Sequence, residues 1–506
     1  MTAALLGIDI GTSGCKALLL ATDGKVIATD TASYPLSRPR PGWTEQDPAL
    51  WIEGVRASVA GALAKAGAVE VLAIGLSGQM HGLTPLDASH RVLRPAILWN
   101  DQRNGPECAA MTEAAGGLPA LLAATNNRML PGYTGGKIVW MQRHEPDLFG
   151  RMTLMLNPKD YLRLVLTGEV ATEVSDASGT GLFDTRARVW ATGLAERLGI
   201  DPGLLPPVFE SPEVTGRLST DGAALLGLPA GIPVVGGGGD SVIQTIGSGV
   251  IAPGELQTTI GTAGILAAAL DAPQDNPDGR LQVFCNVVPG KWHCMGVSLN
   301  AGGAFSWLRD TVLSAAGGAP VPFATLVDEA AESVPGARGL LFLPYLYGER
   351  CPHPDPGARG AFVGLTARHR RGDIVRSVME GVVHAFGDMH ALMATMGIDG
   401  RVIKASGGGA RSPLWRQMQA DLFGCEVVTT EGAAEGAAFG AALVAGIGLG
   451  VWPDGDAAAA CCRPLTRETP DAAAGAIYRR AHAIYRTLYP SLAPAIAELG
   501  DPAFDS

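Results

Sequence analysis

The 506-residue sequence has few charged residues and no cluster of cations. Asp, Glu, Lys and Arg make up 17% of the chain, and 38 Lys and Arg against 49 Asp and Glu give a net charge of −11. Nucleic acids and anionic membranes are bound through clustered cations. We therefore expect no nucleic-acid or membrane partner, and we expect any anionic ligand to be held by local hydrogen-bond donors.

The sequence also lacks the signals of export, membrane insertion and zinc binding. Its first residues have no basic segment and carry Asp9 within the apolar stretch, which is not typical of a signal peptide. The longest uncharged apolar run, 436–452, contains five glycines and fits a packed helix and turn better than a membrane span. The eight cysteines include no CxxC pair. We expect a cytoplasmic protein with reduced, mostly buried thiols.

Glycine, by contrast, is abundant, at 68 of 506 residues. No Gly-X-Y period accompanies it, so we expect tight turns, close packing and loops that approach a ligand. At roughly 100–200 residues per domain, the chain is too long for one compact core. Its length predicts two large lobes or three smaller ones.

One short motif occurs twice, half a chain apart. Ile10-Gly11-Thr12-Ser13-Gly14 returns as Ile260-Gly261-Thr262-Ala263-Gly264, an offset of 250 residues. In both copies the motif follows one apolar run and precedes another, which predicts strand, turn and strand. Helical and strand patterns alternate through the rest of the chain, so we predict an α/β fold with a lobe boundary near 240–253.

The repeated motif is suited to binding phosphate. Glycines let the backbone N–H groups approach a ligand closely, and threonine adds a hydroxyl donor. The loops are not of the Walker A type, because no GxxxxGK[ST] occurs. Asp9 precedes the first loop, and a carboxylate beside a phosphate needs a bridging cation, so Asp9 is a candidate ligand for Mg²⁺. The alternative is a pair of ordinary hairpin turns.

Other segments carry candidate polar groups. Asp240 closes a run of four glycines; it could cap a helix, or it could accept a hydroxyl proton at the join between lobes. The loops 77–82 and 99–103 combine an aromatic or methionine side chain with hydrogen-bonding groups, which suits a polyhydroxylated ligand. In the segment 405–415, glycines would admit a flat ring, and Ser412 could cap a helix or reach a nucleotide.

These motifs together resemble those of the FGGY family of carbohydrate kinases. The matching segments are Asp9–Ser13, Thr259–Thr262, Gly407–Asp421 and the Lys-x-x-Trp signature at 137–140. The resemblance implies two duplicated actin/Hsp70/sugar-kinase-like (ribonuclease H-like) lobes with a nucleotide cleft between them. It places a sugar-binding lobe at 1–245, a second lobe with the adenosine site at 246–490, and a tail at 491–506.

The resemblance also implies roles for individual residues. Asp240 would be the catalytic base, and Asp9 would act in catalysis through Mg²⁺. Met80 and His81 would line the sugar site with Trp99, Asp101 and Asp240. Residues that would bind ATP are Gly11, Thr12, Ser13, Gly261, Thr262, Gly408 and Ser412.

Within the family, several segments are similar to those of the kinases that act on D-xylulose: 77–82, 95–103, 157–163, 342–353 and 407–421. This implies transfer of the ATP γ-phosphoryl group to the terminal hydroxyl of D-xylulose. The alternatives are another ketose or polyol (D-ribulose, L-xylulose, sedoheptulose or a pentitol) or a nucleotide-driven switch without catalysis.

The chain departs from the family pattern at two positions. Ser241 stands where asparagine is frequent and Gly136 where proline is frequent, and these departures bear on the identity of the sugar more than on the reaction type. The expected partners are the sugar and ATP, with a homodimer as the expected assembly.

Overall fold

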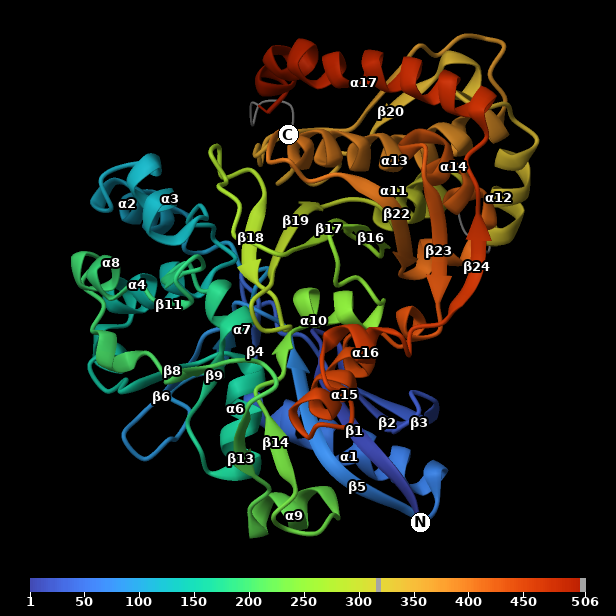
Figure 1. The fold of residues 1–506 in the computed structure, drawn as a ribbon. Coiled ribbons are helices and arrows are strands. Elements are labelled where there is room, and N and C mark those ends of the chain that lie inside the picture. Colours follow the sequence, from blue (N-terminus) through green and yellow to red (C-terminus); the bar gives the residue numbers. More distant parts are fainter. Residues whose placement is uncertain (315–319, 501–506) are drawn as a thin grey trace.

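The computed structural model describes residues 1–314 and 320–500 and shows two α/β lobes, each built on a sheet (Figure 1). In the first sheet, a three-stranded antiparallel meander is extended by parallel strands and ends on an antiparallel edge strand. Its strands run in the order β3 (Val26–Ser33), β2 (Gly14–Ala21), β1 (Thr2–Ile10), β5 (Val69–Gly78), β14 (Pro233–Val235) and β13 (Val214–Arg217), and β15 (Gly238–Gly239) also pairs with β5.

The second sheet repeats this plan with one further strand at its edge. The order is β18 (Gln282–Cys285), β19 (Trp292–Ser298), β17 (Gly264–Leu270), β16 (Gly254–Ile260), β22 (Gly400–Ser406), β23 (Glu426–Thr430) and β24 (Pro464–Glu468). Strand β16 pairs antiparallel with β17 and parallel with β22, as β1 does with β2 and β5. The predicted α/β fold with two duplicated lobes is confirmed.

Local sequence explains where these elements begin and end. Helix α1 (Pro48–Ala66) starts after Asp47, whose side chain accepts a hydrogen bond from the N–H of Ala49, and it ends at Gly67. Its residues Trp51 and Val55 are buried against the first sheet. The hairpin between β2 and β3 turns at Gly24, which has a φ of +85°.

Further helices of the two lobes are α4 (Thr134–His144), α6 (Pro158–Thr167), α11 (Gly302–Trp307) continuing as a π-helical turn over Leu308–Leu313, α13 (Arg371–Thr395), α14 (Pro413–Phe423) and α17 (Ala472–Glu498). Helix α17 continues past residue 490, so the expected start of the tail falls inside a helix.

Two helices near the junction of the lobes pack closely because glycines let the backbones approach each other. Helix α15 (Ala437–Gly448) comes late in the chain but packs on β1 and β5 of the first sheet and against α10 (Asp240–Gly247), as Figure 1 shows. A Cβ atom at Gly440 would lie 2.1 Å from the carbonyl oxygen of Ile243, and one at Gly7 would lie 1.9 Å from that of Ala438. The backbones therefore touch here, and only glycine fits.

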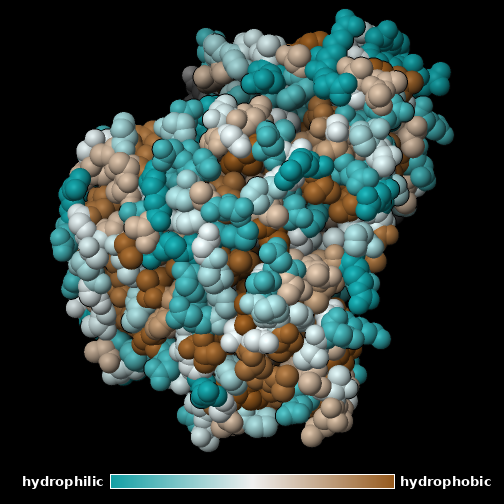
Figure 2. Space-filling model, viewed as in Figure 1, coloured by the Kyte–Doolittle hydropathy of each residue, from teal (hydrophilic) through white to brown (hydrophobic). Residues whose placement is uncertain are grey.

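The surface mixes polar and apolar residues (Figure 2), and most of the thiols lie in the interior. On the face shown in Figure 2, hydrophilic and apolar residues are interspersed. Within residues 1–314 and 320–500, no helix is long and apolar enough to cross a membrane. All eight cysteines are free thiols in the structure, and all but Cys461 are buried.

Candidate functional site

A cavity of about 550 Å³ lies between the two lobes. Its first-lobe wall comes from the end of β1, the loop after β5 and the start of α10. The predicted residues on this wall are Asp9, Met80, His81, Trp99 and Asp240, and Thr262 of the second glycine loop lies opposite in the second lobe. Residues far apart in the sequence are thus brought together at one site.

Asp240 is the first residue of α10, and Gly239 occupies the N-cap position. The carboxylate of Asp240 accepts a hydrogen bond from the backbone N–H of the next residue, Ser241, at 2.7 Å. Burial, followed by the negative charge of Asp9, raises the pKa of Asp240 to about 7, while backbone hydrogen bonds from Ser241 and Met80 oppose this shift. A carboxyl group with this pKa can accept a proton near neutral pH.

Asp9 is the second-last residue of strand β1, just before the first glycine loop. Its Oδ1 accepts a hydrogen bond from the hydroxyl of Ser77 at 2.9 Å. Burial raises the pKa of Asp9, and Ser77 and Lys16 partly offset this effect. Two carboxylates on one cavity wall repel each other unless a cation lies between them or one is protonated.

These residues fit a magnesium ion that arrives on a nucleotide. Mg²⁺ is usually held by one or two carboxylates together with phosphate oxygens and water, and the wall offers the carboxylate of Asp9. In the described part of the chain, no group of three or more His, Cys, Asp or Glu side chains could form a complete protein cage. The available ligands therefore suit a metal ion that also binds nucleotide phosphates and water, better than a metal ion held by protein side chains alone.

His81 is held in a left-handed conformation with a φ of +70°. Its Nδ1 lies 2.6 Å from the carbonyl oxygen of Gly179, and its ring stacks on Tyr133. Its own carbonyl oxygen accepts hydrogen bonds from Thr134 at 3.0 Å and from the Nζ atom of Lys137 at 2.8 Å. Burial lowers the pKa of His81 to about 3, so the ring is neutral, and the residue lines the cavity.

The first glycine loop is braced by hydrogen bonds. Tyr34 donates to the carbonyl oxygen of Gly11 at 2.7 Å, and Trp99 donates from Nε1 to the hydroxyl of Thr12 at 2.9 Å. Ser13 is exposed. Trp99 therefore connects the cavity wall to the loop predicted to bind phosphate. Gln79 is fully buried: its Nε2 donates to Gln46 at 3.1 Å, and its Oε1 accepts a hydrogen bond from the hydroxyl of Thr12 at 3.3 Å, so it also braces this loop.

The predicted adenosine segment lies directly behind the second glycine loop. A Cβ atom at Gly407 would be 2.6 Å from the carbonyl oxygen of Ile260, the residue before Gly261. Gly408 is exposed, and a Cβ atom there would make only an ordinary contact, 3.9 Å from the carbonyl oxygen of Ile260. The hydroxyl of Ser412 accepts a hydrogen bond from the N–H of Trp415 and caps α14, as the capping interpretation predicts.

Asp101 occupies a different place from the other predicted residues. It is fully buried, and its carboxylate accepts hydrogen bonds from the N–H of Thr44 at 2.6 Å and from the guanidinium of Arg103 at 2.7 Å. Within the described residues it does not line the cavity. Its observed contacts hold the segment after Trp99 in place, and its direct binding of sugar stays a prediction.

The two departures from the family pattern have different structural settings. Ser241 lines the cavity, and its hydroxyl donates to the sulfur of Met80 at 2.9 Å. Gly136 is away from the cavity in α4, where a Cβ atom would lie 2.4 Å from Asn104 and 2.6 Å from the sulfur of Cys108. A side chain at 136 would therefore have to displace Asn104 and Cys108, whereas Ser241 is placed to affect the ligand.

Two polar residues of the second lobe were missed by sequence reasoning. Gln282 and Arg350 both line the cavity. The amide of Gln282 is buried, and neither of its polar atoms has a hydrogen-bond partner within the described residues. Burial lowers the pKa of Arg350, and the neighbouring Glu349 is engaged by Ser298 and by backbone N–H groups instead. Both side chains are free to bind a ligand.

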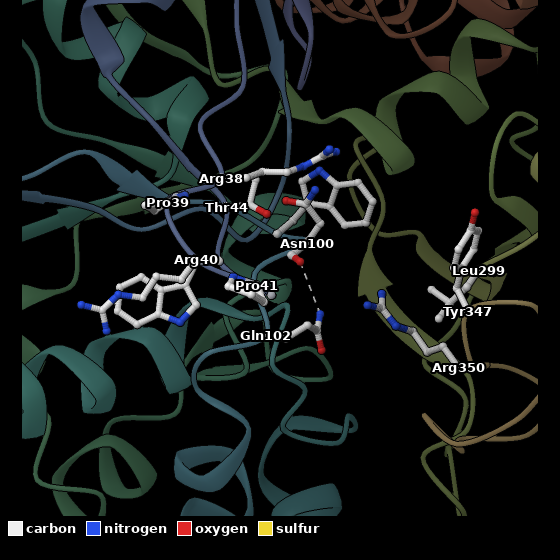
Figure 3. A pocket seen from close by; sticks show the side chains of 13 residues that line it. Arg38, Pro39, Arg40, Pro41, Thr44, Asn100, Gln102, Leu299, Tyr347 and Arg350 are labelled. Atoms are coloured by element: carbon white, nitrogen blue, oxygen red, sulfur yellow. Dashed lines mark hydrogen bonds between the residues drawn. The ribbon is translucent and has the colours of Figure 1, made fainter. Parts of the chain in front are cut away.

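Arg350 also borders a second, outer cavity of about 840 Å³ that shares Trp99 and Leu299 with the first. Figure 3 shows Arg350 and Tyr347 on one side of it, across from Arg38 and Arg40. The outer cavity therefore continues the inner one between the lobes and gives it a wide opening lined by arginines.

Comparison with known proteins agrees with this arrangement. Residues 4–247 match the N-terminal domain, and residues 256–449 the C-terminal domain, of the FGGY family of carbohydrate kinases. The chain belongs to this family, whose members transfer a phosphoryl group from ATP to a sugar hydroxyl. It is therefore a phosphotransferase, and the predictions of family and enzyme class are confirmed.

Individual relatives include kinases of more than one sugar. The chain is 40% identical to a xylulose kinase of Escherichia coli over 83% of this chain and 84% of the relative. It is 32% identical to a gluconokinase of Bacillus subtilis over 85% of each chain. A solved structure described as a xyloylose kinase from Brucella ovis superposes with a TM-score of 0.89 at 38% identity and covers 97% of this chain and 100% of that chain.

Proposed function

We propose that this chain transfers the γ-phosphoryl group of ATP to the terminal hydroxyl of D-xylulose, giving D-xylulose 5-phosphate. The observation that carries the proposal is the placement of Asp240, with its pKa near 7, on the same cavity wall as Asp9 and across from Thr262. The similarity to xylulose kinases over most of the chain supports the choice of sugar.

In this mechanism Asp240 orients the attacking hydroxyl and accepts its proton late, because the transition state of phosphoryl transfer is loose. The loops at 11–13 and 261–262 hold the phosphates. The N–H groups of Gly11 and Gly261 close these loops on the carbonyl oxygens of Gly14 and Ala263, so Thr12, Ser13 and Thr262 supply the backbone donors, and Gly408 and Ser412 lie on the adenosine side. A magnesium ion held at Asp9 would neutralise charge on the phosphoryl oxygens. Most of the rate enhancement then comes from alignment of the two substrates.

The polar and aromatic side chains that line the cavity fit a polyhydroxylated ligand. His81 and Trp99 come from the first lobe, and Gln282 and Arg350 come from the second, so one sugar would contact both lobes. Sugar binding is then expected to favour closure of the lobes, which excludes water as a competing acceptor.

Replacing Arg350 with glutamine is expected to raise the KM for the sugar about 10- to 100-fold and to change the KM for ATP little, because a charge-assisted hydrogen bond to the sugar is lost. Gln282→Ala should act in the same direction with a smaller effect. Steady-state kinetics with each substrate varied in turn measure both constants. Arg359→Gln, an exposed arginine of the same segment, is the control. Equal increases in both KM values would contradict the assignment.

The choice of sugar is tested by comparing kcat/KM over D-xylulose, D-ribulose, L-xylulose, sedoheptulose, a pentitol and gluconate. D-xylulose is expected to give the highest value. Gluconate is included because of the gluconokinase relative and because its carboxylate could pair with Arg350. A higher kcat/KM for another compound would replace D-xylulose as the substrate but keep the reaction.

A further inference from the structure

A cluster of buried charges lies behind the loop that carries Asp240. Its members are Lys159, Asp160, Arg163, Glu173 and Asp176, and each is at most 1% exposed. They come from α6, from β9 (Thr172–Glu173) and from α7 (Val174–Ser178). Charges buried to this extent are costly unless they are paired and hydrogen-bonded, so the cluster needs an explanation beyond packing.

The cluster is bonded to the glycine loop on one side. The guanidinium of Arg163 donates to the carbonyl oxygen of Val235 at 2.8 Å and also to that of Gly236. The hydroxyl of Ser175 accepts a hydrogen bond from the N–H of Gly239 at 3.0 Å. Gly239 is the residue directly before Asp240, so Ser175 fixes the backbone from which that carboxylate projects.

Ser175 is itself held by Glu173. Its hydroxyl donates to Oε1 of Glu173 at 2.8 Å, and the other oxygen of Glu173 accepts a hydrogen bond from Ser211 at 2.7 Å. The carbonyl oxygen of Ser211 in turn accepts a hydrogen bond from the N–H of Gly237. Hydrogen bonds that start at Glu173 therefore reach the glycine loop at two residues: at Gly239 through Ser175, and at Gly237 through Ser211.

The loop needs such external contacts because it has no side chains of its own. Residues 236–239 are all glycine, and Gly237 has a φ of +73° that few other residues adopt. A Cβ atom at Gly237 would lie 2.0 Å from the carbonyl oxygen of Leu76. Glycine is thus required for the close approach, but it leaves the backbone free to move unless neighbouring groups hold it.

We propose that Ser175, held by Glu173, is a positioning residue that fixes the backbone at Gly239 and thereby aligns Asp240 with the attacking hydroxyl. This inference rests on the proposed role of Asp240 as the base. Ser175 touches neither substrate, so its effect should fall on the chemical step and not on binding.

The test compares Ser175→Ala with Ser178→Ala. Both serines are buried in α7, but the hydroxyl of Ser178 bonds to Val174 and Cys285 instead of the loop. Ser175→Ala is expected to lower kcat about 10- to 100-fold with both KM values nearly unchanged, and Ser178→Ala to keep the wild-type kcat. Ser175→Cys keeps the side-chain volume but hydrogen-bonds weakly, and it should lower kcat even if the alanine variant does not fold.

Wild type and Asp240→Asn are measured in the same assay. A kcat of Ser175→Ala or Ser175→Cys equal to that of Ser178→Ala would overturn the positioning role while the proposed function stands. Absence of any sugar-dependent activity in the wild type, or near-normal turnover of Asp240→Asn, would instead overturn the proposed function. An equal loss in Ser175→Ala and Ser178→Ala would show a general effect of α7 and would also contradict positioning by Ser175.

Discussion

Asp240→Asn is expected to lower kcat about 10²- to 10⁴-fold, because asparagine keeps the shape of the side chain but cannot accept the hydroxyl proton. The KM for ATP should change little. Asp221→Asn is the matched control, since Asp221 also lies in the first turn of a helix, α9 (Thr220–Leu226), but is exposed. Initial rates at saturating substrates measure the effect.

The pH dependence gives a second readout of Asp240. In the wild type, kcat/KM for the sugar should fall as the pH drops below the pKa of the base, which is about 7 without ligands and lower when a cation is bound. The residual activity of Asp240→Asn should lack this acid limb. Near-normal turnover of the variant, or an unchanged acid limb, would contradict the assignment.

The same pKa shift has a consequence for stability. Because the folded-state pKa of Asp240 is raised from 3.8 to about 7, its contribution to stability is present at low pH and is lost as the pH rises through about 7. Asparagine removes the buried charge, so the variant should unfold at a higher temperature than wild type at pH above 7 in a chelator. A functional group is thus kept at a cost in stability.

Gly440→Ala is expected to destabilise the fold by at least about 1–3 kcal/mol, because an added Cβ would overlap the backbone of α10. The Cβ would lie 2.1 Å from the carbonyl oxygen of Ile243, and neither helix backbone can give way locally. The helices must separate, and α10 carries Asp240 at its start, so kcat should fall as well. Thermal unfolding and initial rates measure the two effects.

Gly193→Ala is the control for this substitution. Gly193 is exposed in α8 (Thr192–Arg197), and no atom of the described residues lies within 4 Å of a Cβ built there. Alanine should leave stability unchanged or raise it slightly, since it favours helix more than glycine does. A Gly440→Ala protein as stable as Gly193→Ala would show that α10 and α15 are not in fixed backbone contact.

Sequence reasoning succeeded where the signals are local. The repeat of Ile10–Gly14 at Ile260–Gly264 predicted the duplicated hairpins because strand, turn and strand are encoded by neighbouring residues. It also predicted five residues of the cavity wall and Thr262 opposite them. Asp9 is at the end of β1, Met80 and His81 follow β5, and Asp240 follows β15, and these strands are neighbours in one sheet. Their types and spacing therefore carry the information.

It failed where a role depends on contacts distant in sequence. Gln282 has no local signal, and Arg350 lies in the matching segment 342–353, which assigns it no role. Both become ligand-facing only when the second lobe packs against the first. The contacts of Asp101 are decided by Arg103 and by Thr44, which lies 57 residues away. The packing of α15 on the first sheet likewise depends on small residues whose partners the sequence does not identify.

The central claim is sugar phosphorylation with Asp240 as the base, and direct product analysis tests it. Purified protein is incubated with ATP, Mg²⁺ and D-xylulose, and the products are identified by phosphorus NMR with ADP quantified in parallel. We expect ADP and D-xylulose 5-phosphate to form in equal amounts in the wild type. In Asp240→Asn we expect both to form at a rate that is lower by orders of magnitude. ADP formation without any sugar phosphate, or an equal rate in the variant, would contradict the claim.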